Sequence, residues 1–196
     1  MIKFTNSDGQ TPLNPDEIHS LIPDYITLQR ELDELEQSNI LEAEGWLFNR
    51  DHADILEETF LKNSHKRMFG KVWKWAGQFR NSDKNIGCAW TEIPILLRSL
   101  LDDTKYWTEH HTYAADELAI RFHHRLVHQI HAFPNGNGRH ARLMTDLLAR
   151  KLGRERFSWG SDSLVKPGEA RKKYIATLRV ADQNQDFAPL LAFARQ

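Results

Sequence analysis

A twelve-residue stretch, HAFPNGNGRHAR from His131 to Arg142, lies between two segments whose apolar residues recur at helical spacing. It contains two histidines, two arginines, two asparagines and two glycines, but no acid. Because glycine tolerates positive φ, Gly136 and Gly138 allow the chain to turn sharply and to point successive backbone N–H groups at one place. The stretch therefore predicts a helix–turn–helix junction that can hold an anion.

The rest of the chain also shows helical signals. NPDE at 14–17 is typical of a helix start, and apolar spacing predicts helices at about 25–45, 53–75, 91–107, 115–133, 139–153, 169–182 and 187–195. Within 53–75 we expect a turn near Gly70 and a further short helix. The turn-rich stretch RNSDKNIGCAW is the exception, and Ile86–Trp90 could form one arm of a hairpin there. We predict an all-α fold, a single domain over residues 1–196, with at most one short β-hairpin.

Charge is unevenly distributed along a chain whose net charge is only −1, which gives no strong attraction to nucleic acid or membrane. Residues 15–60 carry thirteen acids against only Arg30 and Arg50. Between Glu117 and Asp146 there is no acid, but there are four arginines and five histidines. One part of the chain is suited to receive an anion, and the other could cover it.

Cysteine content and hydropathy indicate the compartment. The lone Cys88 excludes an internal disulfide and fits a reducing cytosol. The first residues lack the apolar core of a signal peptide, and no stretch approaches the length that spans a bilayer. We expect a soluble cytoplasmic protein with no membrane partner. A basic patch favours a solvated face over a nucleic-acid site, so no nucleic-acid partner is expected; it comprises Arg150, Lys151, Arg154 and Arg156.

The stretch from His131 to Arg142 points to phosphate chemistry. Arg139 and Arg142 lie three residues apart, hence on one helix face, and both can bind phosphate oxygens in a forked geometry. His131, just before the turn, can take a proton from an incoming hydroxyl as a neutral imidazole. A plain glycine helix cap is the simpler alternative for such a turn. The combination of a histidine, a turn and two arginines favours a nucleotide site.

The same stretch resembles the signature of the Fic family, which fixes His, Phe, an acid, Gly, Asn, Gly, Arg and Arg. Seven of these eight positions match, namely His131, Phe133, Gly136, Asn137, Gly138, Arg139 and Arg142. Asn135 stands where the family has its acid. MFGKVWKWAGQFRNSDKNIG and YIATLRVADQNQDFAPLLAF are similar to segments before and after the signature, so the resemblance covers about residues 40–195. FPNGNGRHARLM is most similar to the subgroup called mobile mystery protein B.

Membership implies an all-α fold and transfer of AMP from ATP to a Ser, Thr or Tyr hydroxyl of a target protein. His131 would be the general base and Phe133 a buried anchor. The α- and β-phosphates would be held by the turn at Gly136, Asn137, Gly138 and Arg139, and the γ-phosphate by Arg142. The target-binding flap would comprise Ile86, Gly87, Cys88 and Ala89, and an ordinary surface hairpin is the alternative for this segment. A weak nucleotide-binding regulatory module, or transfer of another phosphate-containing group, is the alternative.

Two further features follow from the resemblance. The family's acid helps to hold Mg²⁺ or Mn²⁺, so Asn135 is a weak candidate ligand that offers an oxygen without charge. SNILEA matches the first two positions of the family's inhibitory helix at Ser38 and Glu42, whereas Ala43 departs from the third. Glu42 would then pair with Arg142 in the place of a phosphate, and the helix at about 25–45 would inhibit the enzyme. A solvated acidic face is the alternative.

Other side chains have simpler interpretations. His124, His128 and His131 stand at i, i+4 and i+7 and could bind a transition metal. No nearby acid or cysteine completes such a set, so we expect exposed or core histidines instead. Trp73 and Trp75 are expected to fill the core or to support the flap.

Overall fold

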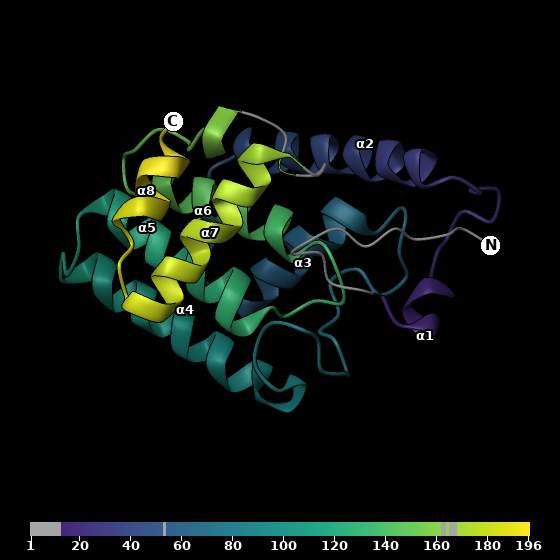
Figure 1. Ribbon diagram of the computed structural model, residues 1–196, viewed down its shortest axis with the longest axis horizontal. Helices are drawn as coiled ribbons and strands as arrows, with labels where there is room; N and C mark the ends of the chain where they lie inside the picture. Colours follow the sequence, from purple (N-terminus) through teal and green to yellow (C-terminus); the bar gives the residue numbers. More distant parts are fainter. Residues whose placement is uncertain (1–12, 53, 162–163, 165–167) are drawn as a thin grey trace.

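The computed structural model describes residues 13–52, 54–161, 164 and 168–196, and its regular elements are helices (Figure 1). They are α1 (Pro15–Ile18), α2 (Gln29–Phe48), α3 (Glu58–Phe69), α4 (Ile93–Glu109), α5 (Ala115–His124), α6 (Asn137–Lys151), α7 (Glu169–Asn184) and α8 (Ala188–Ala194). Short 3-10 helices occur at η1 (Trp90–Glu92) and η3 (Trp159–Ser161), and a π-helix at η2 (Arg125–Ile130). The predicted all-α fold is confirmed. Residues 1–12, on which the absence of a signal peptide was inferred, lie outside the described residues, and the single-domain extent stays a prediction.

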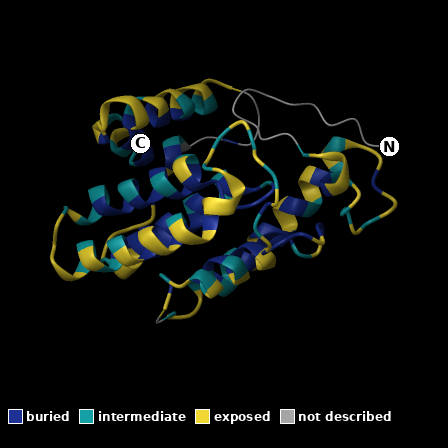
Figure 2. Cartoon of the chain, turned by 90° about the horizontal axis from the view of Figure 1, so that it is seen from below, coloured by how far each residue is buried: buried dark blue, intermediate teal, exposed yellow. Residues whose placement is uncertain are grey.

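The helices pack in pairs around one core. α2 packs on α3, α5 on α6 and α7 on α8, and α2 also reaches α6. Figure 1 shows the long α2 running above α3 and α6, and Figure 2 shows buried residues gathered on the facing sides of the helices. Large side chains that are almost fully excluded from solvent fill the space between them, among them Leu47, Leu61, Phe69, Leu97 and Phe122. In the described part of the chain, no helix combines the length and apolar character needed to cross a membrane.

The face of α2 that points into the core carries Leu32, Glu36, Ile40, Ala43 and Leu47, all of which are buried. These positions follow one another at spacings of three and four residues, as expected for a single helix face. One member of this face is a carboxylate, so α2 brings one negative charge toward the interior.

The N-terminal α1 begins as the sequence predicts. Pro15 occupies the first helical position, and the Glu17 carboxylate accepts the backbone N–H of Asn14 at 2.7 Å. The Nε1 of Trp75 donates to the carbonyl of Glu17 at 3.1 Å, and Lys84 Nζ lies 2.6 Å from its carboxylate. The helix is therefore bound to the loop that follows residue 80.

The hairpin expected at Ile86–Trp90 does not form, and the only β-bridge among the described residues joins Leu21 to Trp73. Backbone groups of this loop bind side chains instead of a partner strand. Arg80 donates to the carbonyls of Ser82 and Cys88, and the N–H of Trp90 donates to Asp83 at 2.8 Å. These side-chain bonds satisfy groups that a hairpin would have paired.

The prediction of a short helix after Gly70 is also wrong. Residues 71–77 form turns, in which Lys74 N–H donates to the Ser20 carbonyl at 2.9 Å. The Val72 carbonyl accepts the N–H of Ile22 at 2.8 Å. The segment thus pairs with residues 20–22, a long-range contact that apolar spacing does not reveal.

Buried histidines make the stability of the fold depend on pH. His65, His131 and His140 are buried, and burial lowers the pKa of His140 to about 3, that of His131 to about 4 and that of His65 well below its ordinary value. Below pH 6.5 these three rings therefore bind more protons in the unfolded chain than in the folded one. The stability that these groups contribute is complete above pH 6.5 and is lost as the pH falls toward 4, by roughly 1 kcal/mol per pH unit for each ring.

We expect the free energy of unfolding, measured by urea titration, to fall steeply from pH 6.5 to pH 4. His140→Gln removes one of these rings and should reduce the slope, whereas His19→Gln, at an exposed position, should leave it unchanged. Equal slopes for wild type and His140→Gln would contradict this explanation.

Candidate active site

The turn between η2 and α6 is shaped by Gly136 and Asn137. Gly136 has φ +79°, and a Cβ at this position would lie 2.6 Å from the ring of Phe69, so only glycine fits. The side-chain amide of Asn137 accepts the N–H of Phe133 at 2.9 Å and donates to its carbonyl at 2.7 Å. Asn137 therefore closes the turn with its side chain and offers a ligand only its backbone N–H at the start of α6.

His65 on α3 supports the same turn, a role the sequence did not reveal. Its Nδ1 accepts the N–H of Gly77 at 3.0 Å, so the proton is on Nε2, which donates to the Asn135 carbonyl at 3.0 Å. The ring stacks on Phe133 at 3.8 Å between centroids. Phe133 is thus the buried anchor that the resemblance implies, with 1% of its surface exposed. Both polar partners of His65 are distant in sequence, so no local pattern marks it.

His131 terminates the π-helix η2 in a left-handed conformation, with φ 51° and ψ 59°. Its Nδ1 lies 2.8 Å from the carbonyl of Val127. Because a carbonyl only accepts, Nδ1 carries the proton and the lone pair of the neutral ring is on Nε2. Burial lowers the pKa of His131 to about 4, so the ring is a neutral base at physiological pH.

A buried arginine that the sequence analysis missed holds His131 in place. Arg80 is 2% exposed, and its Nε donates to the His131 carbonyl at 2.7 Å. Its two terminal nitrogens donate to the carbonyls of Cys88 and Ser82 at 2.5 and 2.9 Å. Arg80 therefore ties the strained end of η2 to the loop that contains the predicted flap. An arginine in a turn-rich segment carries no local sign of such a role.

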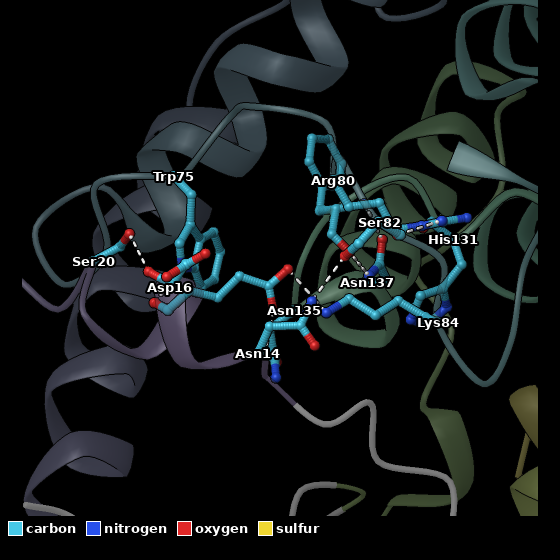
Figure 3. A network of polar contacts seen from close by, with 12 residues as sticks. Asn14, Asp16, Ser20, Trp75, Arg80, Ser82, Lys84, His131, Asn135 and Asn137 are labelled. Carbon is cyan, nitrogen blue, oxygen red and sulfur yellow. Dashed lines mark hydrogen bonds and ion pairs between the residues drawn. The ribbon is translucent and has the colours of Figure 1, made fainter. Parts of the chain in front are cut away.

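Within the predicted flap Ile86–Ala89, Gly87 lies beside His131, and Cys88 Sγ lies 3.5 Å from the Ile130 carbonyl. Gly87 has φ +96°, and a Cβ there would lie 2.6 Å from the Cβ of His131. In Figure 3 the loop residues Ser82 and Lys84 gather with Arg80, His131 and Asn135 in one polar network, to which Asn14 also contributes. The fold thus brings the flap segment and His131 together, although no strand forms.

The two arginines of the motif have different partners. Arg139 Nη1 forms a short ion pair with Glu36 Oε2 of α2 and lies over the ring of Phe69. The other oxygen of Glu36 accepts Trp73 Nε1 at 2.6 Å. The Arg142 guanidinium lies 5.8 Å from the ring centroid of Tyr174 and forms no ion pair with any described residue. Gly138 lies beside it, since a Cβ there would be 3.5 Å from Arg142 Nη1.

The expected pair between Glu42 and Arg142 is wrong. Glu42 is 59% exposed on its side chain and binds Lys71 Nζ at 2.5 Å, and Ser38 is exposed as well. Both lie half a turn away from the buried face of α2, which carries Glu36. An acid of α2 does reach the motif, but it is Glu36, and its partner is Arg139.

Asn135 is poorly suited to hold a divalent cation. Its side-chain oxygen accepts the N–H of Gly136 at 2.6 Å, and its backbone carbonyl accepts from His65. Residues 118–145 contain no acid. Mg²⁺ prefers carboxylate and phosphate oxygens, whereas the side-chain oxygen of Asn135 is neutral and already hydrogen-bonded.

The remaining predicted residues have structural partners. Trp73 and Trp75 are buried and stack at 5.0 Å, as expected for core and support residues. In the basic patch, Arg154 pairs with Asp116, and Arg156 with Glu44 and Asp146. The absence of a nucleic-acid partner stays a prediction.

Comparison with known proteins supports the motif. Residues 55–149 match the Fic/DOC family model. The chain is 29% identical over 151 residues to protein adenylyltransferase fic-1 of Caenorhabditis briggsae, covering 75% of this chain and 28% of that protein. It is 31% identical over 144 residues to protein adenylyltransferase Fic of Drosophila melanogaster, covering 71% and 26%. The chain thus spans less than a third of the length of these curated relatives.

Solved structures share the fold. BepC of Bartonella tribocorum, a VirB-translocated effector crystallised with bound AMPPNP, superposes with a TM-score of 0.68 at 16% identity. The match covers 93% of this chain and 97% of BepC. The narrower resemblance to mobile mystery protein B stays a prediction.

The close approach of Gly87 to His131 gives a test of the loop geometry. Gly87→Ala adds a Cβ that overlaps His131 at a positive φ, and should lower the free energy of unfolding by about 1–3 kcal/mol. Gly153→Ala is the matched control, because Gly153 has φ +74° but no atom within 4 Å of the new Cβ. Thermal or urea unfolding should show a clearly larger loss for Gly87→Ala. Equal losses would mean that the loop does not press against His131.

Proposed function

Since this chain belongs to the Fic/DOC family through its residues 55–149, we propose that it is a protein adenylyltransferase that moves AMP from ATP to a Ser, Thr or Tyr hydroxyl of a target protein. The observation that carries the proposal is the neutral His131, with its lone pair on Nε2, directly before the N-terminus of α6. Two proteins to which this chain is similar are named protein adenylyltransferases, which supports the choice of AMP. A cytoplasmic location stays part of the proposal.

The start of α6 supplies the phosphate site. The first intrahelical bond of α6 runs from His140 N–H to the Gly136 carbonyl, so the N–H groups of residues 137–139 have no helical acceptor. They and the positive end of the helix dipole attract the phosphates. Arg139 and Arg142 add two guanidinium groups, which bind a polyphosphate in a forked geometry.

The chemistry follows from this placement. His131 Nε2 takes the proton of the target hydroxyl while that oxygen forms a bond to the α-phosphorus of ATP. The bond between the α-phosphorus and the bridging oxygen breaks, and pyrophosphate leaves with its charge against the arginines and the α6 N-terminus. The loop at Ile86–Ala89 is placed to hold the main chain of the target beside His131.

A divalent cation, Mg²⁺ or Mn²⁺, is part of the proposed cofactor set, but Asn135 does not fit a dedicated protein site for it. The ion would be held mainly by the phosphates, where it would neutralise charge. The remaining chemistry is carried by His131, the arginines and the backbone of α6.

Self-inhibition by α2 is also part of the proposal, with Glu36 in the role first assigned to Glu42. The side chain of Glu36 is only 9% exposed, and its carboxylate forms an ion pair with Arg139. A phosphate would bind the same guanidinium group. Trp73 holds the second oxygen of Glu36, so the carboxylate is fixed in this position. ATP must displace this ion pair before Arg139 can bind its phosphates, which lowers activity.

The proposal is tested by incubating the protein with ATP and Mg²⁺ or Mn²⁺ and measuring its intact mass and that of added target proteins. A mass increment of one AMP is expected, and His131→Ala should reduce the rate by roughly 10²- to 10⁴-fold while ATP binding persists. Because the pKa of His131 lies at about 4, the base form predominates above that pH. The rate should therefore fall only as the pH drops toward 4, and not near 6.5.

Equal labelling by His131→Ala would rule out His131 as the base. A different mass increment would indicate transfer of another phosphate-containing group. Nucleotide binding without any labelling, in wild type and in Glu36→Gln, would favour the regulatory module.

The inhibitory role of Glu36 predicts a gain of activity. Glu36→Gln keeps the side-chain size but removes the charge, so Arg139 becomes available to phosphate. Labelling should accelerate roughly tenfold, within the usual range of coupling between sites. Without nucleotide the variant should unfold at a lower temperature, because Arg139 loses its partner. Glu42→Gln is the matched control on the exposed face of α2 and should behave like wild type. If Glu36→Gln labels no faster at saturating ATP, α2 is only a structural helix.

A further inference from the structure

Two histidines and an aspartate meet where the end of α5 and the π-helix η2 face α7. The Oδ1 of Asp182 lies 3.6 Å from His124 Nε2 and 3.3 Å from His128 Nδ1. One ligand atom from each of the three residues lies within 4.8 Å of the others. The two imidazole rings are nearly parallel, with centroids 5.4 Å apart. α5 and α7 pack against each other, so the cluster lies on packed helices and not in a loop (Figure 1).

We propose that His124, His128 and Asp182 form a binding site for one first-row transition cation, of which Zn²⁺ is the best fit. Zinc takes nitrogen and oxygen ligands at about 2.0–2.2 Å in a tetrahedron, which places neighbouring ligand atoms about 3.4 Å apart. The two measured distances to Asp182 lie close to this edge length. Two imidazoles with one carboxylate form a ligand set typical of zinc.

His124 supplies an independent reason to expect a ligand. It is fully buried, and neither of its ring nitrogens has a hydrogen-bond partner among the described residues. Buried polar atoms without a partner are rare because each costs free energy. A metal bond to Nε2 would satisfy one of these atoms.

A direct hydrogen bond does not explain the cluster. The distance of 3.6 Å between His124 Nε2 and Asp182 Oδ1 is too long for one. A cation between the two atoms would satisfy both of them.

The site differs from the histidine triple considered from the sequence. His131 does not join His124 and His128, because it is not among the residues whose ligand atoms lie within 4.8 Å of one another. Asp182 completes the set from α7, a helix that the sequence does not place beside η2. The site is also chemically distinct from any ion carried by ATP, since Mg²⁺ prefers oxygen ligands.

The proposed cation site is open to solvent and lies close to His131 in the sequence. Asp182 is 40% exposed on its side chain and His128 25%, so a cation can enter from solvent. Three protein ligands leave the fourth position to water. A bound cation would link η2 to α7, and would thereby stabilise the segment that directly precedes His131.

The test is a titration of untagged, chelator-treated protein with Co²⁺, a spectroscopic substitute for Zn²⁺, in the absence of nucleotide. We expect one Co²⁺ per chain, the visible absorption of a tetrahedral site, and its displacement by Zn²⁺. Asp182→Asn and His128→Ala should each weaken binding by roughly tenfold or more, and Zn²⁺ should raise the unfolding temperature of wild type only.

Controls distinguish this site from others on the chain. His19→Ala and Asp102→Asn remove an exposed histidine and an exposed acid elsewhere, and His131→Ala removes the neighbouring ring. All three should bind Co²⁺ like wild type. Asp182→Asn and His128→Ala change partly exposed side chains, and circular dichroism checks that both fold. Absence of a tetrahedral spectrum in wild type, or an unchanged affinity in folded Asp182→Asn, would overturn the proposal.

Discussion

The geometry at His131 depends on the buried guanidinium of Arg80. A buried charge is costly unless its donors are bound, and here backbone carbonyls bind them, including that of Ile130 at 3.3 Å. Those carbonyls belong to the end of η2 and to the loop after Arg80. Since one rigid, planar group binds both segments, their separation is set by its size. The left-handed conformation of His131, which costs roughly 1–2 kcal/mol, persists because both sides are held.

The turn between η2 and α6, which is the proposed phosphate site, is also held by bonds between side chains and backbone. The side chain of Asn137 binds the backbone of Phe133 within the turn, and His65 of α3 donates to the Asn135 carbonyl. What is left for a ligand is the start of α6 and the two arginines. A site built in this way needs little reorganisation when an anion binds. Under the proposed function, the contact that ATP would have to open is the ion pair between Arg139 and Glu36.

Local patterns predicted most of the helices and the motif, because helix periodicity and glycine turns act over a few residues. The register of α2 was not predictable in this way. Leu41 is 56% exposed and Leu28 46%, so leucines lie on both faces of the chain around this helix, and apolar spacing did not distinguish the face of Glu36 from that of Glu42. Arg80, His65 and Asp182 act only through residues far away in sequence. Their roles therefore depend on tertiary packing, and no local sequence pattern indicates them.

Because the stretch between Glu117 and Asp146 contains no acid, the acids that lie beside Arg139 and beside His124 and His128 come from other helices. Glu36 reaches Arg139 from α2, and Asp182 reaches His124 and His128 from α7. The two acids approach from different helices and share no partner. Under the proposed function, an incoming triphosphate would compete with Glu36 for Arg139 but would leave Asp182 beside the histidines. The proposed phosphate site would then open on the α2 side without disturbing the contact of η2 with α7.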